Sequence, residues 1–139
     1  MKDCVFCDLI SGRSAALVVF EDEYTFVFLD RRPLFPGHCL VVPKRHVETL
    51  SELPPELIDP LFSVVQRLSV AVPEATEARG SFVAMNNIVS QSVPHLHVHV
   101  VPRNPKDGLK GFFWPRTTYK TEEEAEKVRQ AVADRLCLD

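Results

Sequence analysis

The segment most informative for both fold and function is Pro94-His95-Leu96-His97-Val98-His99-Val100-Val101. It holds three of the five histidines, and they alternate with apolar residues. Such alternation predicts a β-strand with the three imidazoles on one face and the apolar side chains on the other. A row of imidazoles is costly to bury unless it meets a metal ion or an anion. We therefore expect these histidines to bind a metal ion or an anion or to take part in catalysis. A strand whose histidines are purely structural is the lesser alternative.

The composition excludes several classes of function. A chain of 139 residues can form one domain with its own core. The net charge is -3 at pH 7, so the chain has no broad positively charged surface that would attract phosphates. We therefore expect no nucleic-acid partner. The longest apolar run, residues 15–20, is too short to span a bilayer, and no apolar signal segment follows Met1. We therefore expect no membrane partner and a cytoplasmic location.

The predicted elements favour an α+β fold. Their type follows from apolar periodicity and from the turn residues between them. In chain order they are a short helix over 4–10, strands over 17–20, 24–29 and 39–42, a long helix from about Pro54 that Pro73 kinks or ends, strands over 82–85 and 94–101, and a helix opened by the capping box Thr121-x-x-Glu124, with Ala125, Val128, Val132 and Leu136 as a buried stripe. Short turns between neighbouring strands predict an antiparallel sheet of about five strands, with one long helix and a C-terminal helix.

The cysteines leave three possibilities open. Four cysteines could form two disulfides, but that framework is typical of small secreted chains. Cys4-Val5-Phe6-Cys7 has the spacing that lets two thiolates bind one zinc ion, which is half of a tetrahedral site. A metal site, a redox pair and incidental burial all fit this pair taken alone.

The three histidines also allow two hypotheses. Along a strand, His95 and His99 would stand about 13 Å apart, so three rings do not converge on one ion. A His-x-His pair can share a metal ion, which leaves a zinc hydrolase with an open coordination position as one hypothesis. In the other hypothesis one ring attacks the substrate, one holds its anion, and one is structural or binds a metal.

Residues 91–101 resemble the histidine triad (HIT) motif, in which three histidines alternate with apolar residues. Further motifs follow the order of that superfamily, and in this chain they are Cys4–Cys7, Phe28–Pro33, Pro36–His38, Val42–His46 and Asn86-Asn87. The resemblance covers about residues 4–103. It implies a HIT-like fold and a nucleotidyl hydrolase or transferase that acts at the α-phosphate of nucleotides.

The resemblance implies a role for each histidine. His97 would attack phosphorus to form a nucleotidyl-histidine that water then hydrolyses. His99 would contact the phosphate or the leaving group, and His38 would be a further active-site histidine. Zinc-containing, bacterial-type members imply a closed, structural zinc site, and carried over to this chain its ligands are Cys4, Cys7, His46 and His95.

The resemblance also implies a nucleotide site. Asp30 matches the ribose-contacting position, Asn86 and Ser92 match polar groups that face the phosphates, and Gln91 is grouped with them and can also set the turn. The base pocket corresponds to four apolar residues that would otherwise be core: Val5, Phe6, Leu9 and Phe28. In the phosphate loop Ile88-Val89-Ser90 stands where glycines are common, and the loop is about two residues shorter.

A single HIT domain over 1–139 is therefore expected, with residues 4–103 carrying the motifs and residues 104–139 forming a tail that sets specificity. Within the tail, Phe112-Phe113-Trp114 either contributes to specificity or packs over the sheet. The family also implies a homodimer. We expect an enzyme that cleaves a purine nucleotide conjugate, which is a phosphoramidate, an acyl phosphate or a dinucleoside polyphosphate. The alternatives are a zinc-dependent hydrolase with the triad as metal ligands and a non-catalytic nucleotide-sensing module.

Overall fold

The computed structural model describes residues 3–110 and 116–137. The chain forms two compact units, Met1–Asp107 and Gly108–Asp139, and each is described by itself. The predicted start of the tail at residue 104 lies close to this division, and the single domain over 1–139 stays a prediction. The segment Phe112-Phe113-Trp114 lies outside the described residues, so its contribution to specificity or to packing stays a prediction.

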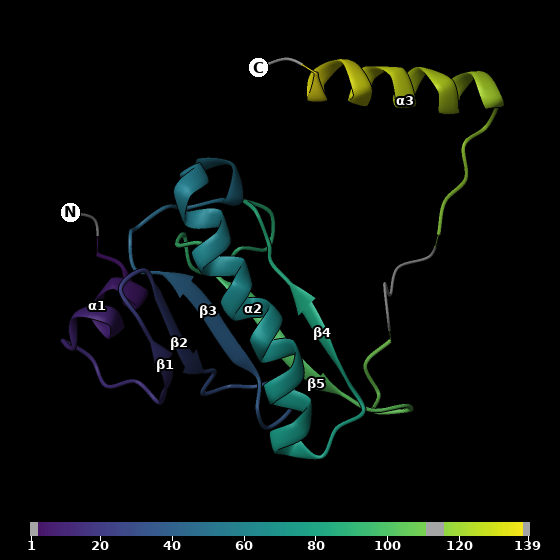
Figure 1. Cartoon of the computed structure of the whole chain (residues 1–139). Coiled ribbons are helices and arrows are strands. Elements are labelled where there is room, and N and C mark those ends of the chain that lie inside the picture. Colours follow the sequence, from purple (N-terminus) through teal and green to yellow (C-terminus); the bar gives the residue numbers. More distant parts are fainter. Residues whose placement is uncertain (1–2, 111–115, 138–139) are drawn as a thin grey trace. The chain divides into compact units, whose positions relative to one another are not determined.

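A five-stranded antiparallel sheet is the centre of the first unit, in the order β1-β2-β3-β5-β4 (Figure 1). The strands are β1 Val18–Glu21, β2 Thr25–Leu29, β3 Cys39–Pro43, β4 Gly80–Ala84 and β5 Val98–Arg103. The strands expected over 17–20 and 24–29 are present as β1 and β2, which pair in antiparallel fashion. The sheet and its helices confirm the expected α+β class.

The long helix α2, Pro55–Thr76, covers one face of the sheet (Figure 1). Its buried residues recur at three- and four-residue spacing and pack on Val41, Val98 and Val100. Leu61 is among the most deeply buried of them, and removing such a side chain from water stabilises a fold by about 2 kcal/mol. Pro73 is expected to kink or end the helix, and the second alternative is wrong, because α2 continues to Thr76 and closes on Glu77 in a left-handed conformation. A proline in the last turn removes only one backbone donor, which a helix can tolerate there.

The short helix α1, Val5–Ser11, packs on the opposite face. Alternate residues of β3 show this: Cys39 and Val41 face α2, whereas Leu40 and Val42 contact the cluster that includes Phe6 of α1. As predicted, Gly12 ends the helix, with φ of 80° in the left-handed region. The face under α1 is the one that holds the histidines.

The strand expected over residues 94–101 begins later than the alternation suggested. β5 starts at Val98, so His95 and His97 precede the ladder. The backbone N–H of Leu96 donates to the Val47 carbonyl at 2.8 Å, and that of His95 donates to the Val93 carbonyl at 2.8 Å. These bonds take backbone groups that a regular strand would use, so His95 lies in a bend and His97 in the irregular segment just before the strand.

The second unit contains α3, Glu122–Leu136. Its capping box forms as predicted, because the Thr121 hydroxyl accepts from the Glu124 backbone N–H at 3.0 Å. The second unit by itself does not bury the predicted stripe: α3 has no buried residue, and Val128, Val132 and Leu136 are exposed. An amphipathic pattern predicts which face can be buried, but burial needs a partner surface.

None of the described helices is both long and apolar enough to cross a bilayer.

Candidate active site and metal centre

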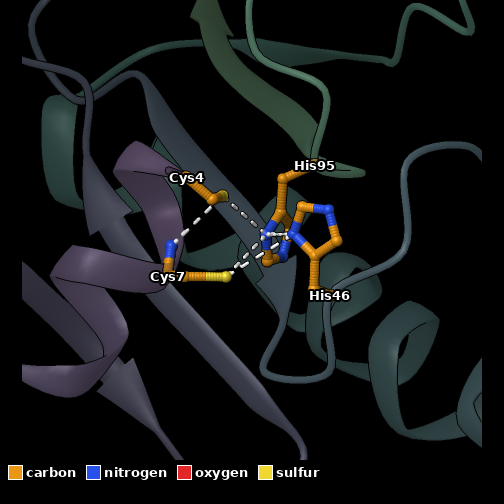
Figure 2. Close-up of side chains that lie close together, drawn as sticks. All are labelled: Cys4, Cys7, His46 and His95. Carbon is orange, nitrogen blue, oxygen red and sulfur yellow. Dashed lines mark hydrogen bonds between the residues drawn. The ribbon is translucent and has the colours of Figure 1, made fainter. Parts of the chain in front are cut away.

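Two cysteines and two histidines converge beside α1. Cys4 caps the helix and Cys7 lies in its first turn, so the turn points both thiols the same way. His46 follows β3 and His95 precedes β5, and both rings point at the thiols (Figure 2). The four donor atoms, two Sγ and two Nδ1, all lie within 4.8 Å of one another. The structure thus brings together the four residues that the resemblance assigned to zinc.

The distances within this cluster fit a tetrahedral zinc ion. Bond lengths of about 2.3 Å to sulfur and about 2.05 Å to nitrogen give sulfur–nitrogen edges of about 3.6 Å and a nitrogen–nitrogen edge of about 3.3 Å. The observed sulfur–nitrogen distances are 3.4 Å for Cys4–His95, 3.5 Å for Cys7–His46 and 3.7 Å for Cys7–His95. The two Nδ1 atoms are 3.1 Å apart. The donor set leaves no open position, which is typical of a structural site.

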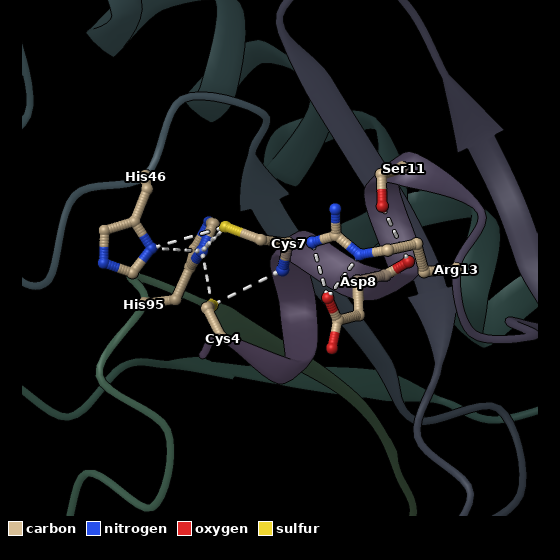
Figure 3. A network of polar contacts seen from close by, with 7 residues as sticks. All are labelled: Cys4, Cys7, Asp8, Ser11, Arg13, His46 and His95. Atoms are coloured by element: carbon tan, nitrogen blue, oxygen red, sulfur yellow. Dashed lines mark hydrogen bonds and ion pairs between the residues drawn. The ribbon is translucent and has the colours of Figure 1, made fainter. Parts of the chain in front are cut away.

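Polar groups next to the cluster act on Cys7. Burial, the neighbouring Cys4 and the charge of Asp8 raise the pKa of the Cys7 thiol to about 11, and Arg13 opposes them. Arg13 forms two hydrogen bonds with Asp8, at 2.9 and 2.6 Å, and this pair lies directly beside Cys7 (Figure 3). A thiol with a raised pKa must lose its proton to bind a metal ion, so metal binding here would release protons.

The ring of His95 is held in one tautomer. Its Nε2–H donates to the Pro43 carbonyl at 2.8 Å, and because a carbonyl only accepts, the proton is on Nε2. Nδ1 then carries the lone pair that faces the thiols. Burial, together with the nearby rings of His46 and His97, lowers the pKa of His95 to about 4, although the Pro43 bond acts in the other direction. A neutral ring with a fixed lone pair is the form that binds a metal ion.

The backbone of His95 fixes the next histidine of the triad. The Nδ1–H of His97 donates to the His95 carbonyl at 2.7 Å. This bond leaves the Nε2 of His97 with the free lone pair, which is the form of an imidazole that can attack phosphorus. Phe6 packs edge-on against both rings, with centroids 5.8 Å from His95 and 5.0 Å from His97.

His38 and His99 form a second pair on the same face. The Leu34 backbone N–H donates to His38 Nδ1 at 3.1 Å, so the proton of His38 is on Nε2. That Nε2–H donates to His99 Nδ1 at 2.9 Å. The proton of His99 is consequently on its own Nε2, where it can donate to a ligand. The ring centroids of His97 and His99 are 5.0 Å apart, so an acceptor and a donor lie side by side.

The surroundings keep this pair neutral. Burial lowers the pKa of His38, while the Asp30 carboxylate, 3.9 Å from His38 Nε2, raises it. Burial and the neighbouring His97 and His38 lower the pKa of His99 to about 4. Gly37, with φ of 102°, brings the chain into His38, and a Cβ there would lie 2.6 Å from the Thr76 methyl. The turn before His38 therefore requires glycine.

The residues predicted for the base pocket are divided between core and surface. Phe6 and Phe28 are buried with ring centroids 5.3 Å apart, and Leu9 packs against their cluster. Val5 is exposed.

The polar residues predicted to face the phosphates follow β4. Asn86 donates to the Ser90 carbonyl at 3.2 Å, and Ser92 is exposed. Both atoms of the Gln91 amide are bonded within the chain: Oε1 accepts from the Ile88 N–H at 3.0 Å, and Nε2 donates to the Glu48 carbonyl at 2.6 Å.

Three functional groups were missed from the sequence. They are the carbonyls of Pro43 and His95 and the backbone N–H of Leu34, which set the tautomers of the histidines. Because every residue type has such groups, no sequence signal marks them.

Comparison with known proteins agrees with this geometry. The family model described as HIT domain matches residues 11–106. An adenylylsulfatase of Arabidopsis thaliana is 35% identical over 98% of this chain and 71% of its own length. An adenosine 5'-monophosphoramidase of Candida albicans is 30% identical over 81% of this chain and 78% of its own length.

Solved structures give the same result. A HIT-family protein from Bacillus subtilis has a TM-score of 0.87 at 32% identity, over 99% of this chain and 100% of that one. A zinc-bound histidine triad protein from Mycobacterium smegmatis has a TM-score of 0.73 at 36% identity, over 99% of this chain and 98% of that one. The resemblance seen in the sequence is confirmed: this chain belongs to the histidine triad family and is a hydrolase of that family.

Proposed function

We propose that this protein cleaves a purine nucleotide conjugate at its α-phosphate through a nucleotidyl intermediate on His97. The observation that carries the proposal is the 2.7 Å bond from His97 Nδ1–H to the His95 carbonyl, which leaves Nε2 free to attack. The named activities of the Arabidopsis and Candida relatives, adenylylsulfatase and adenosine monophosphoramidase, support a nucleotide substrate. A phosphoramidate, an acyl phosphate and a dinucleoside polyphosphate share an α-phosphorus that such a nucleophile can attack. The bond that breaks is P–N in the phosphoramidate and P–O in the other two.

The proposed reaction has two displacements. In the first, His97 Nε2 forms a bond to the α-phosphorus and the bond from phosphorus to the leaving group breaks. The ring then carries a positive charge, which the His95 carbonyl stabilises through Nδ1–H. The Nε2–H of His99 is available to donate to the phosphate or to the departing atom. In the second step water attacks phosphorus and loses a proton to the solvent, the N–P bond breaks with its electron pair returning to His97 Nε2, and a nucleoside monophosphate leaves.

The remaining site residues have proposed roles around that centre. Asp30 accepts from the ribose hydroxyls, and His38 holds the tautomer of His99. Phe6, Phe28, Leu9 and Val5 contribute the apolar base site, and Asn86 and Ser92 face the phosphates. Their support is their location beside the histidines or in the loop that follows β4.

We also propose that Cys4, Cys7, His46 and His95 hold a structural zinc ion. The support is the tetrahedral spacing of the four donors and the zinc in the Mycobacterium relative. A bound ion would cross-link α1 to the segments around His46 and His95. It would thereby fix the residue whose carbonyl orients His97.

We favour separate roles for the triad histidines over one shared metal site. Of the three, only His95 belongs to the four-residue cluster. His99 lies with Asp30 and His38 in a second group of possible ligands, but there His38 Nε2 and His99 Nδ1 are joined by a hydrogen bond of 2.9 Å. A catalytic zinc would also need an open coordination position, which this four-donor cluster does not leave.

A homodimer is proposed as well. Its support is the exposed apolar face of α3, where Val128, Val132 and Leu136 can be buried only against another surface.

The decisive experiment traps the intermediate. Wild-type protein is mixed with an adenosine phosphoramidate, quenched without acid, and digested for mass spectrometry. We expect an adenylyl group on the peptide that contains His97, and none in His97→Ala, whose turnover falls on the order of a thousand-fold or more. Cys137→Ser, a change at an exposed residue of the second unit, is the control. Turnover by the wild type with no adduct, combined with complete loss on chelation, would favour the zinc-hydrolase alternative instead.

A further inference from the structure

We propose that Gln91 is a positioning residue that holds residues 86–92, here called the phosphate loop, against the segment that follows His46. This inference rests on the proposed function only in taking residues 86–92 to face the nucleotide phosphates. The observations that support this inference are hydrogen bonds between residues of the chain.

The phosphate loop bends at two residues that are not glycine. Ile88 has φ of 70° and Ser90 has φ of 62°, both in the left-handed region. This conformation is unfavourable for a residue with a Cβ and more so for a β-branched one such as Ile88. Ile88 and Val89 are each 78% exposed, so their side chains bury little surface that could offset that cost. Other contacts must therefore hold the bend.

Some of these contacts lie within the loop, where Asn86 donates to the Ser90 carbonyl at 3.2 Å. The amide of Gln91 adds a link to another segment. Its Oε1 accepts from the backbone N–H of Ile88 at 3.0 Å, so it is bonded directly to one of the two strained residues. Its Nε2 donates to the Glu48 carbonyl at 2.6 Å, two residues after His46. A single planar, neutral group, which offers both an acceptor and a donor, thus joins the bend to a separate segment of the chain.

Two more hydrogen bonds join the same segments. The Leu50 backbone N–H donates to Asn87 Oδ1 at 2.8 Å, and the Leu96 backbone N–H donates to the Val47 carbonyl at 2.8 Å. Residues 47–50 are consequently bonded to the chain within the loop, at Asn87 and Gln91, and after it, at Leu96. The segment that begins at His46, the phosphate loop and the histidine stretch form one hydrogen-bonded body.

This arrangement gives Gln91 a different task from that of a phosphate ligand. Its Oε1 is already bonded to the Ile88 N–H within the loop, and its Nε2 is bonded to the Glu48 carbonyl. The main effect of Gln91 on a bound nucleotide is therefore through the shape of the loop. Losing it should weaken nucleotide binding and leave the His97 chemistry nearly intact. A direct ligand of the reacting phosphate would instead lower kcat.

The test compares Gln91→Met, which keeps the length of the side chain and removes both hydrogen bonds, with Gln66→Met on the exposed face of α2 as the matched control. For Gln91→Met we expect amide hydrogen exchange over residues 86–92 to quicken about tenfold, and KM for an adenosine phosphoramidate to rise about tenfold, with kcat changed less than about twofold. The Gln66 variant should match the wild type. Asn87→Ala, which removes the neighbouring link to Leu50, should shift the same quantities in the same direction.

A second substitution adds a rescue. Glycine adopts the left-handed bend without cost, so Ile88→Gly placed in the Gln91→Met background should recover part of the KM. Unchanged exchange in Gln91→Met, or a fall in kcat at constant KM, would overturn the positioning role. If the wild type turns over no nucleotide conjugate, the proposed function fails, and the exchange measurement still decides whether Gln91 holds the loop.

Discussion

The carbonyl of His95 accepts a 2.7 Å hydrogen bond from Nδ1 of His97, while the ring of His95 faces Cys4 and Cys7. One residue therefore contacts both the proposed nucleophile, His97, and the proposed metal site. Its side chain belongs to the cluster, and its backbone sets the tautomer of the His97 ring. This connection gives a structural zinc site a measurable effect on catalysis.

Loss of the metal should consequently reduce kcat more than it changes KM. Cys4→Ser keeps a hydrogen-bond acceptor at the start of α1 but replaces a thiolate ligand. We expect the variant to lose about one zinc per chain and to show a roughly tenfold lower kcat. Cys137→Ser should retain both values. Zinc content by mass spectrometry and steady-state kinetics give the answer, and a variant with no zinc and full kcat would contradict the connection.

The bond between His38 and His99 predicts a difference between two substitutions. The amide nitrogen of a glutamine can replace the donor at His38 Nε2, whereas asparagine is too short to reach His99 Nδ1. We expect His38→Asn to lower kcat about tenfold more than His38→Gln does. Equal losses would mean that His38 acts by packing alone.

The carboxylate of Asp30 is expected to bind the ribose. Asp30→Ala should raise KM about tenfold for a ribonucleotide substrate, the cost of two charge-assisted hydrogen bonds at a partly buried carboxylate. A 2',3'-dideoxy substrate should bind wild type and variant almost equally, because the groups that distinguish them are then absent. A variant that loses affinity equally for both substrates would show that Asp30 acts through His38 instead.

The lowered pKa of His99 predicts a dependence of stability on pH. Burial holds this pKa near 4, against an ordinary value of 6.5, so between these values the unfolded chain binds more protons than the folded one. The contribution is complete above pH 6.5 and is lost as pH falls towards 4, with a size on the order of 2 kcal/mol after allowance for partial exposure. Denaturant unfolding of wild type and His99→Gln should give curves whose difference changes over this interval. A difference that is constant with pH would rule the shift out.

The exposed face of α3 predicts an effect on assembly. Val132→Glu places a charge in the middle of the apolar stripe, whereas Gln130→Glu changes an exposed polar position on the same helix. If the stripe is the dimer contact, the first variant should dissociate and the second should not, as measured by light scattering after size exclusion. A wild type that is monomeric at micromolar concentration would refute the dimer.

Most elements and the family follow from the sequence alone. Periodic apolar residues define α2 and the strands, the capping box marks the start of α3, and the separated motifs identify the histidine triad family. These features are local, or they depend on residue type, so they can be read along the chain. The same reading gave the four residues of the cysteine–histidine cluster through the resemblance.

Only the tertiary structure shows which ring nitrogen of each histidine carries the proton. It also shows where the strand begins and whether the apolar face of α3 is buried. The proton of His95 is placed by Pro43, that of His97 by the His95 carbonyl, and that of His38 by Leu34. The strand begins at Val98 because Val47 takes the N–H of Leu96, and the apolar stripe of α3 is exposed because the pattern does not supply a partner surface. Backbone carbonyls and amides are the same in every residue, so which of them meets a given ring depends on the path of the folded chain.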